Sequence, residues 1–195
     1  MRIEATGILG HSNINTHKAC YTFSSFIALS NGKLLAAARC GDNKDSELET
    51  VEFFFSTDEG ENWNLPITPF KKVIVDNKKG TLKLCYFTEI SSSHLLAAFL
   101  WIDRSTHPGK ELFNAETEGC LPMKVLLSDS YDQGKTWGKL RSVEMPKEIG
   151  PPSLTNPIIR LQDGTLLMSI ENNKHYLDKS KWKQKAVFLS STDNG

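Results

Sequence analysis

The sequence has 195 residues, is 39% hydrophobic, and carries 23 basic and 23 acidic residues for a formal net charge of zero. This composition is typical of a globular domain rather than a disordered chain. Because the charges are spread along the whole chain, we predict neither a nucleic-acid nor a membrane partner. The longest apolar stretch, Leu95 to Ile102, is far shorter than the roughly 20 residues of a membrane-spanning helix. The first residues show no secretory signal, so we expect a cytoplasmic protein.

Two apolar hairpins with the same pattern stand near the two ends of the chain. The first, SFIALSNGKLLAAAR, turns at Asn31-Gly32, and the second, NPIIRLQDGTLLMSIE, turns at Asp163-Gly164. Such pairs accept the positive φ angles of a tight turn, and the two segments align without a gap. A looser middle unit has TLKLCYFTE and LLAAFLWID around a serine-rich break. The chain is therefore predicted to contain a structural repeat.

Each hairpin is followed by a polar loop and a third apolar strand, so that three units cover approximately residues 19–75, 81–146 and 154–195. The third strands are nearly all apolar, as expected where both faces of a sheet are covered. Helical periodicity is nearly absent. We therefore predict an all-β fold, namely about two and a half blades of a β-propeller with four-stranded antiparallel blades.

Each third strand runs into a turn of shared sequence: STDEGENW from Ser56, SYDQGKTW from Ser130, and STDNG from Ser191. Serine and aspartate oxygens can accept hydrogen bonds from nearby backbone N–H groups, glycine accepts a positive φ, and tryptophan can anchor the returning strand in the core. The aspartates are thus expected to form turns rather than to catalyse a reaction. These residues are Asp58, Asp132 and Asp193.

The turns match the Asp-box pattern Ser-x-Asp-x-Gly-x-Thr-Trp, and with the hairpins the whole chain resembles the sialidase-like (neuraminidase) BNR-repeat family. The resemblance implies a six-bladed propeller and hydrolysis of a terminal sialic acid without a cofactor. It implies three arginines that hold the substrate carboxylate, an Asp acid/base, and a Tyr nucleophile assisted by a Glu. The Tyr and two of the arginines would lie beyond Gly195.

Two parts of that machinery can be compared with this sequence. Where the family has an Arg-Ile-Pro run, this chain reads Tyr21-Thr22-Phe23-Ser24, so the first arginine is missing. Lys18 nearby could supply a positive charge, but without the planar guanidinium fork of an arginine. The loop after the first hairpin, which carries the acid/base Asp in the family, offers Asp45 and, as second choice, Asp42. The alternative for either aspartate is a solvated charge or an Asx turn.

In a propeller the loops between second and third strands gather around one axis, so these loops should line a shared carbohydrate site. The alternative is that they are polar because they face water, which we favour for Arg104 and His107. Glu171 and His175, four residues apart, fall short of a metal ligand set. The expected substrate-binding residues are Arg39, Lys18, Arg104, Glu171, Asn173, His175 and Tyr176, with Trp182 as an additional stacking surface.

The four cysteines lack close CxxC spacing, so we predict buried thiols and neither a zinc site nor a disulfide, although the first hairpin brings the strands of Cys20 and Cys40 together. The third turn stops at Gly195 before any Thr-Trp, and we expect a piece of a longer protein whose further blades close the propeller.

Two functions follow from the sequence. The leading hypothesis is a glycoside hydrolase resembling exo-sialidases, with Asp45 protonating the leaving oxygen. The alternative is a non-catalytic propeller that binds a glycan or a protein partner, and the missing arginine favours it.

Overall fold

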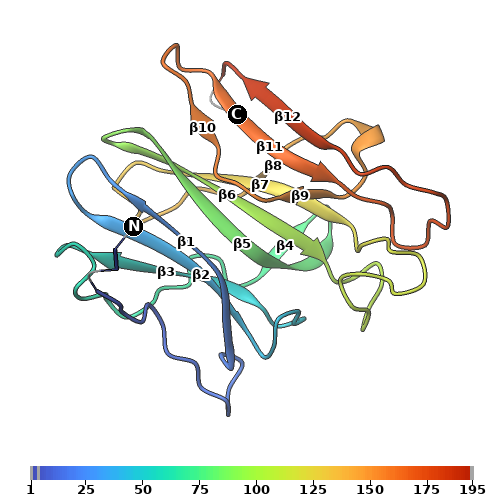
Figure 1. The fold of residues 1–195 in the computed structure, drawn as a ribbon, viewed down its shortest axis with the longest axis horizontal. Helices are drawn as coiled ribbons and strands as arrows, with labels where there is room; N and C mark the ends of the chain where they lie inside the picture. Colours follow the sequence, from blue (N-terminus) through green and yellow to red (C-terminus); the bar gives the residue numbers. More distant parts are fainter. Residues whose placement is uncertain (1, 4, 194–195) are drawn as a thin grey trace.

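The computed structural model describes residues 2–3 and 5–193, and its strands form three antiparallel sheets. Figure 1 shows the sheets as successive layers, coloured blue to cyan, green to yellow, and orange to red along the chain. The last residue of the third turn, Gly195, lies outside the described residues. No helix in the described part is long and apolar enough to cross a membrane.

The first sheet contains β1 (Cys20–Ala28), β2 (Leu34–Gly41) and β3 (Thr50–Ser56) in that order. The predicted turn at Asn31-Gly32 is confirmed, with Gly32 at a φ of 84°. In place of a full fourth strand, the returning chain makes an isolated bridge from Ile67 to Phe53 of β3.

The second sheet has the order β4 (Val73–Val75), β5 (Lys78–Ser91), β6 (His94–Asp103), β7 (Met123–Ser130) and β8 (Arg141–Ser142). Residues 73–75 therefore join the second sheet, although the sequence placed them in the first unit. The reason is a tight turn at Asp76-Asn77, where the two residues have positive φ angles of 50° and 61°. The turn makes β5 run back along β4, and the two strands pair.

The third sheet is built on β11 (Leu166–Asn172), which pairs on one side with β12 (Ala186–Ser191) and on the other with both β9 (Pro152–Leu154) and β10 (Ile159–Arg160). A short 3-10 turn, η1 (Lys147–Ile149), leads into β9. The predicted turn at Asp163-Gly164 is confirmed by a φ of 92° at Gly164. The sequence predicts that the third strand of each unit is covered on both faces. This is confirmed for β3 and β7, whereas β12 alternates in exposure and leaves Phe188 75% exposed.

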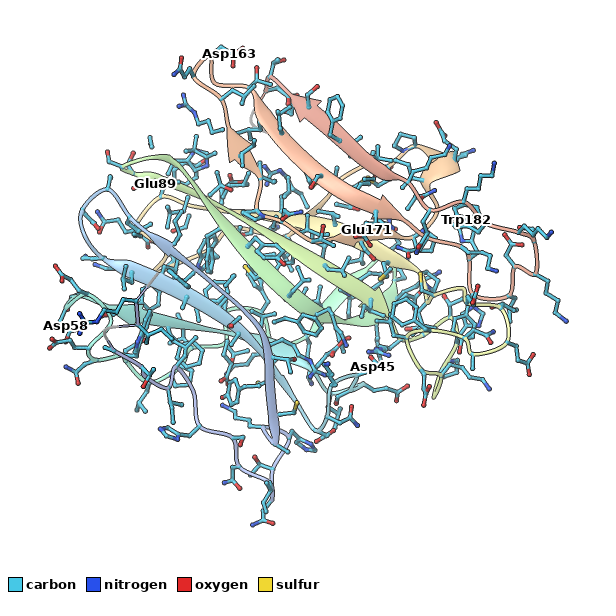
Figure 2. All side chains as sticks on the ribbon, viewed as in Figure 1. Asp45, Asp58, Glu89, Asp163, Glu171 and Trp182 are labelled. Carbon is cyan, nitrogen blue, oxygen red and sulfur yellow. The ribbon has the colours of Figure 1, made fainter. Side chains whose placement is uncertain are left out.

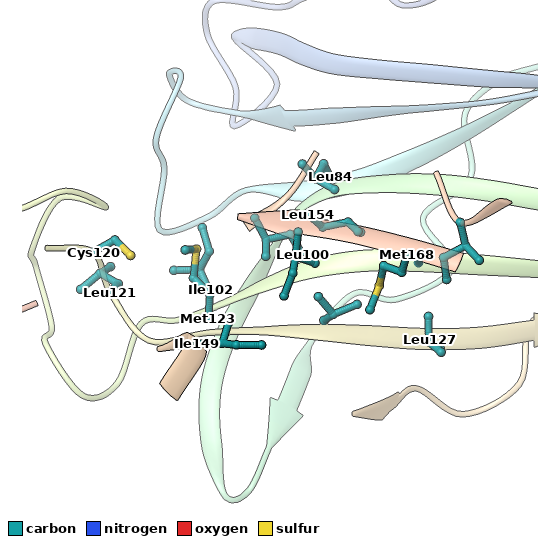
Figure 3. Packing of buried hydrophobic residues seen from close by; sticks show 14 of the residues in the cluster. Leu84, Leu100, Ile102, Cys120, Leu121, Met123, Leu127, Ile149, Leu154 and Met168 are labelled. Atoms are coloured by element: carbon teal, nitrogen blue, oxygen red, sulfur yellow. The ribbon is translucent and has the colours of Figure 1, made fainter. Parts of the chain in front are cut away.

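The sheets stack face to face because the middle sheet is apolar on both sides. Along β6, Phe99 and Trp101 join a core shared with the first sheet, whereas the alternate residues Leu100 and Ile102 join a core shared with the third sheet. Figure 3 shows the second of these cores, where Leu100 and its neighbours meet residues of β9 and β11. The fold is therefore a set of radial layers rather than one closed sandwich.

The shared turns have the same hydrogen bonds in both complete copies. In the second copy, Ser130 Oγ accepts the Gly134 amide at 2.9 Å, and Asp132 accepts both the amide and the hydroxyl of Thr136, at 2.8 and 2.6 Å. Trp137 then packs between the first two sheets, 5.5 Å from Phe53 by ring centroids. These contacts agree with the turn-forming role expected of the aspartates.

The first copy repeats the arrangement with asparagine in place of threonine: Asp58 accepts the Asn62 amide at 3.0 Å and the Asn62 side chain at 2.8 Å. In the third, Asp193 pairs with the hydroxyl of Ser191 at 2.5 Å.

All four cysteines are free thiols. Cys20 is opposite Gly41 while Cys40 is opposite Tyr21, so the two side chains are one position out of step and point to opposite faces of the sheet. Cys40, Cys85 and Cys120 are buried, as predicted, and Cys20 is half-buried.

Candidate functional site

The loops between second and third strands meet at one end of the three sheets. Asp45 in the β2–β3 loop accepts the amide of Leu112 in the β6–β7 loop at 2.7 Å, and Thr117 of the latter donates to the Tyr176 carbonyl in the β11–β12 loop at 2.7 Å. Figure 2 shows Asp45, Glu171 and Trp182 toward this end, with Asp58 and Asp163 toward the other. The three predicted loops therefore form one continuous surface.

A cluster of five charged side chains lies where the first two sheets face each other. Its centre is Glu49, whose side chain is fully buried. Glu49 accepts from Arg39 Nε at 2.7 Å, from Lys83 Nζ at 3.3 Å and from Arg104 Nη2 at 3.0 Å. With Asp45, the cluster has three cations against two carboxylates. Its excess positive charge favours an anionic ligand nearby.

Arg39 belongs to the interior of this cluster. Its side chain is 0% exposed, and its guanidinium contacts Glu49, Thr22 and the Asn43 carbonyl. Arg39 therefore supports the loop that carries Asp45, and direct contact of Arg39 with a substrate stays a prediction.

Asp45 is the cluster member that reaches the surface, with 28% of its side chain exposed. Its Oδ1 accepts from Arg104 Nη2 at 2.5 Å and lies 3.3 Å from Lys83 Nζ. Burial alone would raise the pKa of Asp45, but the hydrogen bonds from Arg104 and Leu112 and the charges of Arg104 and Lys83 together hold the pKa below its usual value. In this state Asp45 is a carboxylate at neutral pH.

A cleft of about 610 Å³ opens beside Asp45 and Lys83, with the rings of Phe23 and Phe113 among its walls. Phe23 lies in an irregularity of β1 where the strand register shifts, and its φ of 50° is a conformation that bulky residues rarely adopt. Lys83 Nζ lies 5.5 Å from the centroid of the Phe23 ring. The strained Phe23 lies within Tyr21-Thr22-Phe23-Ser24, the stretch that stands where the resemblance implies an Arg-Ile-Pro run.

The structure separates Lys18 and Asp42 from this cluster. Lys18 forms an ion pair with Glu52, which also accepts the Tyr21 hydroxyl at 2.5 Å. Glu52 pairs across the sheet with Ala38 and so faces away from the second sheet. Asp42 is exposed and binds His17 at 3.0 Å and the hydroxyl of Ser46 at 3.1 Å. Neither residue shares the cleft beside Asp45.

The predicted residues of the third loop divide into exposed and buried ones. Glu171 and His175 are exposed. Asn173 is buried and donates to the Pro151 carbonyl at 3.1 Å and to Ser153 Oγ at 2.9 Å. The Tyr176 ring is buried too and stacks on His107 with a centroid distance of 4.7 Å. Asn173 and Tyr176 thus hold the loops together. No group of three or more metal-ligating side chains occurs in the described part of the chain.

Glu49 and Lys83 are the residues that sequence reasoning missed. Lys83 is a lysine inside an otherwise apolar strand, and its ammonium also donates to the Lys44 carbonyl at 2.8 Å. A buried cation within a strand calls for a partner, and this was the available signal.

No protein-family model and no curated protein matches this sequence. Solved structures do match. The Hadza microbial sialidase Hz136 has a TM-score of 0.65 at 16% identity, over 92% of this chain and 36% of that one. The chain is a partial β-propeller.

Two further structures show the range of proteins that share this fold. A PL25 ulvan lyase bound to -[GlcA(1-4)Rha3S]- has a TM-score of 0.60 at 12% identity, over 93% of this chain and 43% of that one. An α-L-arabinanase of Penicillium chrysogenum has a TM-score of 0.55 at 14% identity, over 87% and 46%. The chain thus spans less than half of each of these three structures. At these identities the likeness shows a fold found in carbohydrate-active enzymes.

Proposed function

We propose that the chain is part of a glycoside hydrolase that resembles exo-sialidases and removes a terminal acidic sugar. The observation that carries the proposal is the partly exposed carboxylate of Asp45, held by Arg104 beside a cleft with aromatic walls. The similar structures support the same class of ligand, because they include sialidases and a lyase bound to a glucuronate-containing sugar.

In the proposed mechanism Arg104 exchanges partners. The carboxylate of an incoming acidic sugar competes with Asp45 for the guanidinium, which suits planar, bidentate recognition of a carboxylate. Once Arg104 turns to the substrate, Asp45 loses the hydrogen bond and the charge of Arg104 that lower its pKa, so its pKa rises. Asp45 can then hold a proton and deliver it to the leaving glycosidic oxygen, while a nucleophile from outside residues 1–195 attacks the anomeric carbon.

The test compares Asp45→Asn with wild type in the protein that carries this chain. The substrates are two sialosides, one with an aryl and one with an alkyl leaving group. Loss of a general acid should lower kcat for the alkyl sialoside by about 100-fold or more. The kcat for the aryl sialoside should fall much less, because its leaving group needs little protonation.

The matched control is Asp163→Asn, which alters a turn carboxylate at the opposite end of the sheets that accepts the Thr165 amide at 2.9 Å. Equal losses for the two leaving groups, or an equal effect of the control, would remove Asp45 from the proton transfer.

A second candidate is a non-catalytic propeller that binds a glycan. The lowered pKa of Asp45 favours it, since a carboxylate fixed by Arg104 suits binding better than proton donation. If the intact protein binds sialosides and does not hydrolyse them, the second function is the correct one.

A further inference from the structure

A second cleft, of about 800 Å³, lies beyond Phe113 on the same loop surface. Phe113 lines both this cleft and the one beside Asp45. The second cleft is otherwise formed mainly by the β11–β12 loop, including Trp182, Lys174, Lys181 and Gln184. Figure 2 shows Trp182 at the loop end of the sheets. Aromatic surfaces beside an amide and ammonium groups are suited to a sugar that carries acidic groups.

The loop is strongly basic although the chain as a whole is neutral. Residues 174–185 contain five lysines against a single acidic residue, Asp178. Four of the lysines are exposed, and none of their ammonium groups makes an ion pair or hydrogen bond within the described part of the chain. These are Lys179, Lys181, Lys183 and Lys185. The overall charge balance conceals this local excess, which makes the loop an attractive site for anions.

Lys174 is the buried cation of this loop, with the residue 8% exposed, and Asp178 acts on it only as a charge beyond ion-pair distance. Among the described residues its ammonium donates to the Ser180 carbonyl at 3.2 Å and forms no ion pair. Burying a charge without an opposite charge is costly, and such groups in proteins are usually paired. Glu118 is the one carboxylate among the described residues that line the cleft, and it is exposed. An anionic group bound in the cleft would supply an opposite charge at ion-pair distance.

Trp182 adds a second unfilled interaction. Its indole N–H is buried and has no hydrogen-bond partner within the described part of the chain. Buried donors without partners are rare in folded proteins, and an ordered water or a ligand commonly accounts for one. Trp182 and Lys174 thus border the same cleft, where the indole N–H lacks an acceptor and the ammonium lacks a carboxylate at ion-pair distance. An acidic sugar could provide both.

We propose that this cleft, formed by Trp182, Phe113 and the lysine-rich loop 174–185, is a separate binding site for an acidic polysaccharide segment. The carboxylates or sulfates of the sugar bind the lysines, and its rings pack on the aromatic side chains. The site does not depend on hydrolysis at Asp45. Because Phe113 borders both clefts, one acidic glycan can occupy them together.

The test measures binding of a short oligogalacturonate by calorimetry at low and moderate salt, with its fully methyl-esterified, neutral form as the matched ligand. The charged form should bind more tightly than the neutral form, and its binding should weaken as salt increases. Lys181→Gln with Lys183→Gln should weaken binding of the charged form by about tenfold and leave the neutral form unchanged. The paired control, Lys71→Gln with Lys135→Gln, removes two exposed lysines elsewhere and should have no effect.

Two more variants separate a binding role from a structural one. Lys174→Met removes the buried charge, so it should reduce the preference for the charged ligand while the melting temperature stays level or rises. Trp182→Ala should weaken binding of both the charged and the neutral ligand. Calorimetry measures binding without turnover, so this result does not depend on whether the proposed hydrolysis at Asp45 occurs.

Equal binding of the charged and neutral forms would overturn the proposal, as would an equal loss in the Lys71 and Lys135 control. Tighter binding of phosphatidylserine vesicles or single-stranded DNA than of the oligogalacturonate, at matched salt, would also overturn it, because the loop would then serve a different anion.

Discussion

Replacing Glu49 by glutamine tests whether the buried cluster supports the fold as well as the cleft. The side chain is fully buried and contacts the cations of Arg39, Lys83 and Arg104, so the change leaves three cations with Asp45 as the remaining carboxylate of the cluster. Removing one partner of a buried ion pair typically costs about 3 to 5 kcal/mol. Glutamine keeps the size and one acceptor oxygen, and we expect the lower end, about 3 kcal/mol.

The assay is equilibrium unfolding in urea, followed by tryptophan fluorescence, for wild type, Glu49→Gln and the exposed control Glu61→Gln. The control should lie within about 0.5 kcal/mol of wild type. A double variant that replaces Arg39 by methionine and Glu49 by leucine should recover part of the loss, because apolar residues of similar size can replace a buried ion pair. A loss below about 1 kcal/mol in Glu49→Gln would refute the reasoning that Glu49 neutralises the cluster.

Three further predictions concern the scaffold. Trp137→Ala should lower the free energy of unfolding by about 3 kcal/mol in the same urea assay, because the half-buried ring packs against the core between the first two sheets. The Asp132 pKa is lowered to about 2, chiefly by hydrogen bonds from Thr136. The stability that Asp132 contributes is therefore present above the pKa of about 3.9 in the unfolded chain and is lost as pH falls toward 2. The melting temperature of Asp132→Asn should depend less on pH in that window than the melting temperature of wild type. Alkylation at neutral pH, read by mass spectrometry, should modify half-buried Cys20 before Cys40 and Cys120, because burial raises the pKa of those thiols to about 11 and about 12.

Local turn chemistry made much of the fold predictable. Asn31-Gly32 and Asp163-Gly164 fix two hairpins by residue type alone, and the repeated Ser-x-Asp turns mark where third strands end. The pair Asp76-Asn77 carries the same signal and could have placed β4 in the second sheet, but without a glycine it reads as a loop. β12 leaves Phe188 exposed because, within the described part of the chain, no further sheet packs on that face.

The candidate site was less accessible to sequence reasoning because its contacts join distant segments. Asp45 was placed by its loop, yet its partner Arg104 is 59 residues away. Glu49 resembles any other acidic loop residue until the fold brings three cations to it. The basic loop 174–185 is visible in the sequence, but the lack of a carboxylate at ion-pair distance from the Lys174 ammonium appears only when burial and partners are known.

The most direct test of the proposed function is the pKa of Asp45, measured by NMR on the carboxyl carbon with and without saturating sialic acid. We predict a value below that of an ordinary aspartate in the free protein and a marked rise with the sugar bound, because Arg104 then pairs with the ligand carboxylate. A pKa that is already high in the free protein, or one that sialic acid leaves unchanged, would contradict the exchange of partners on which the proposed function depends.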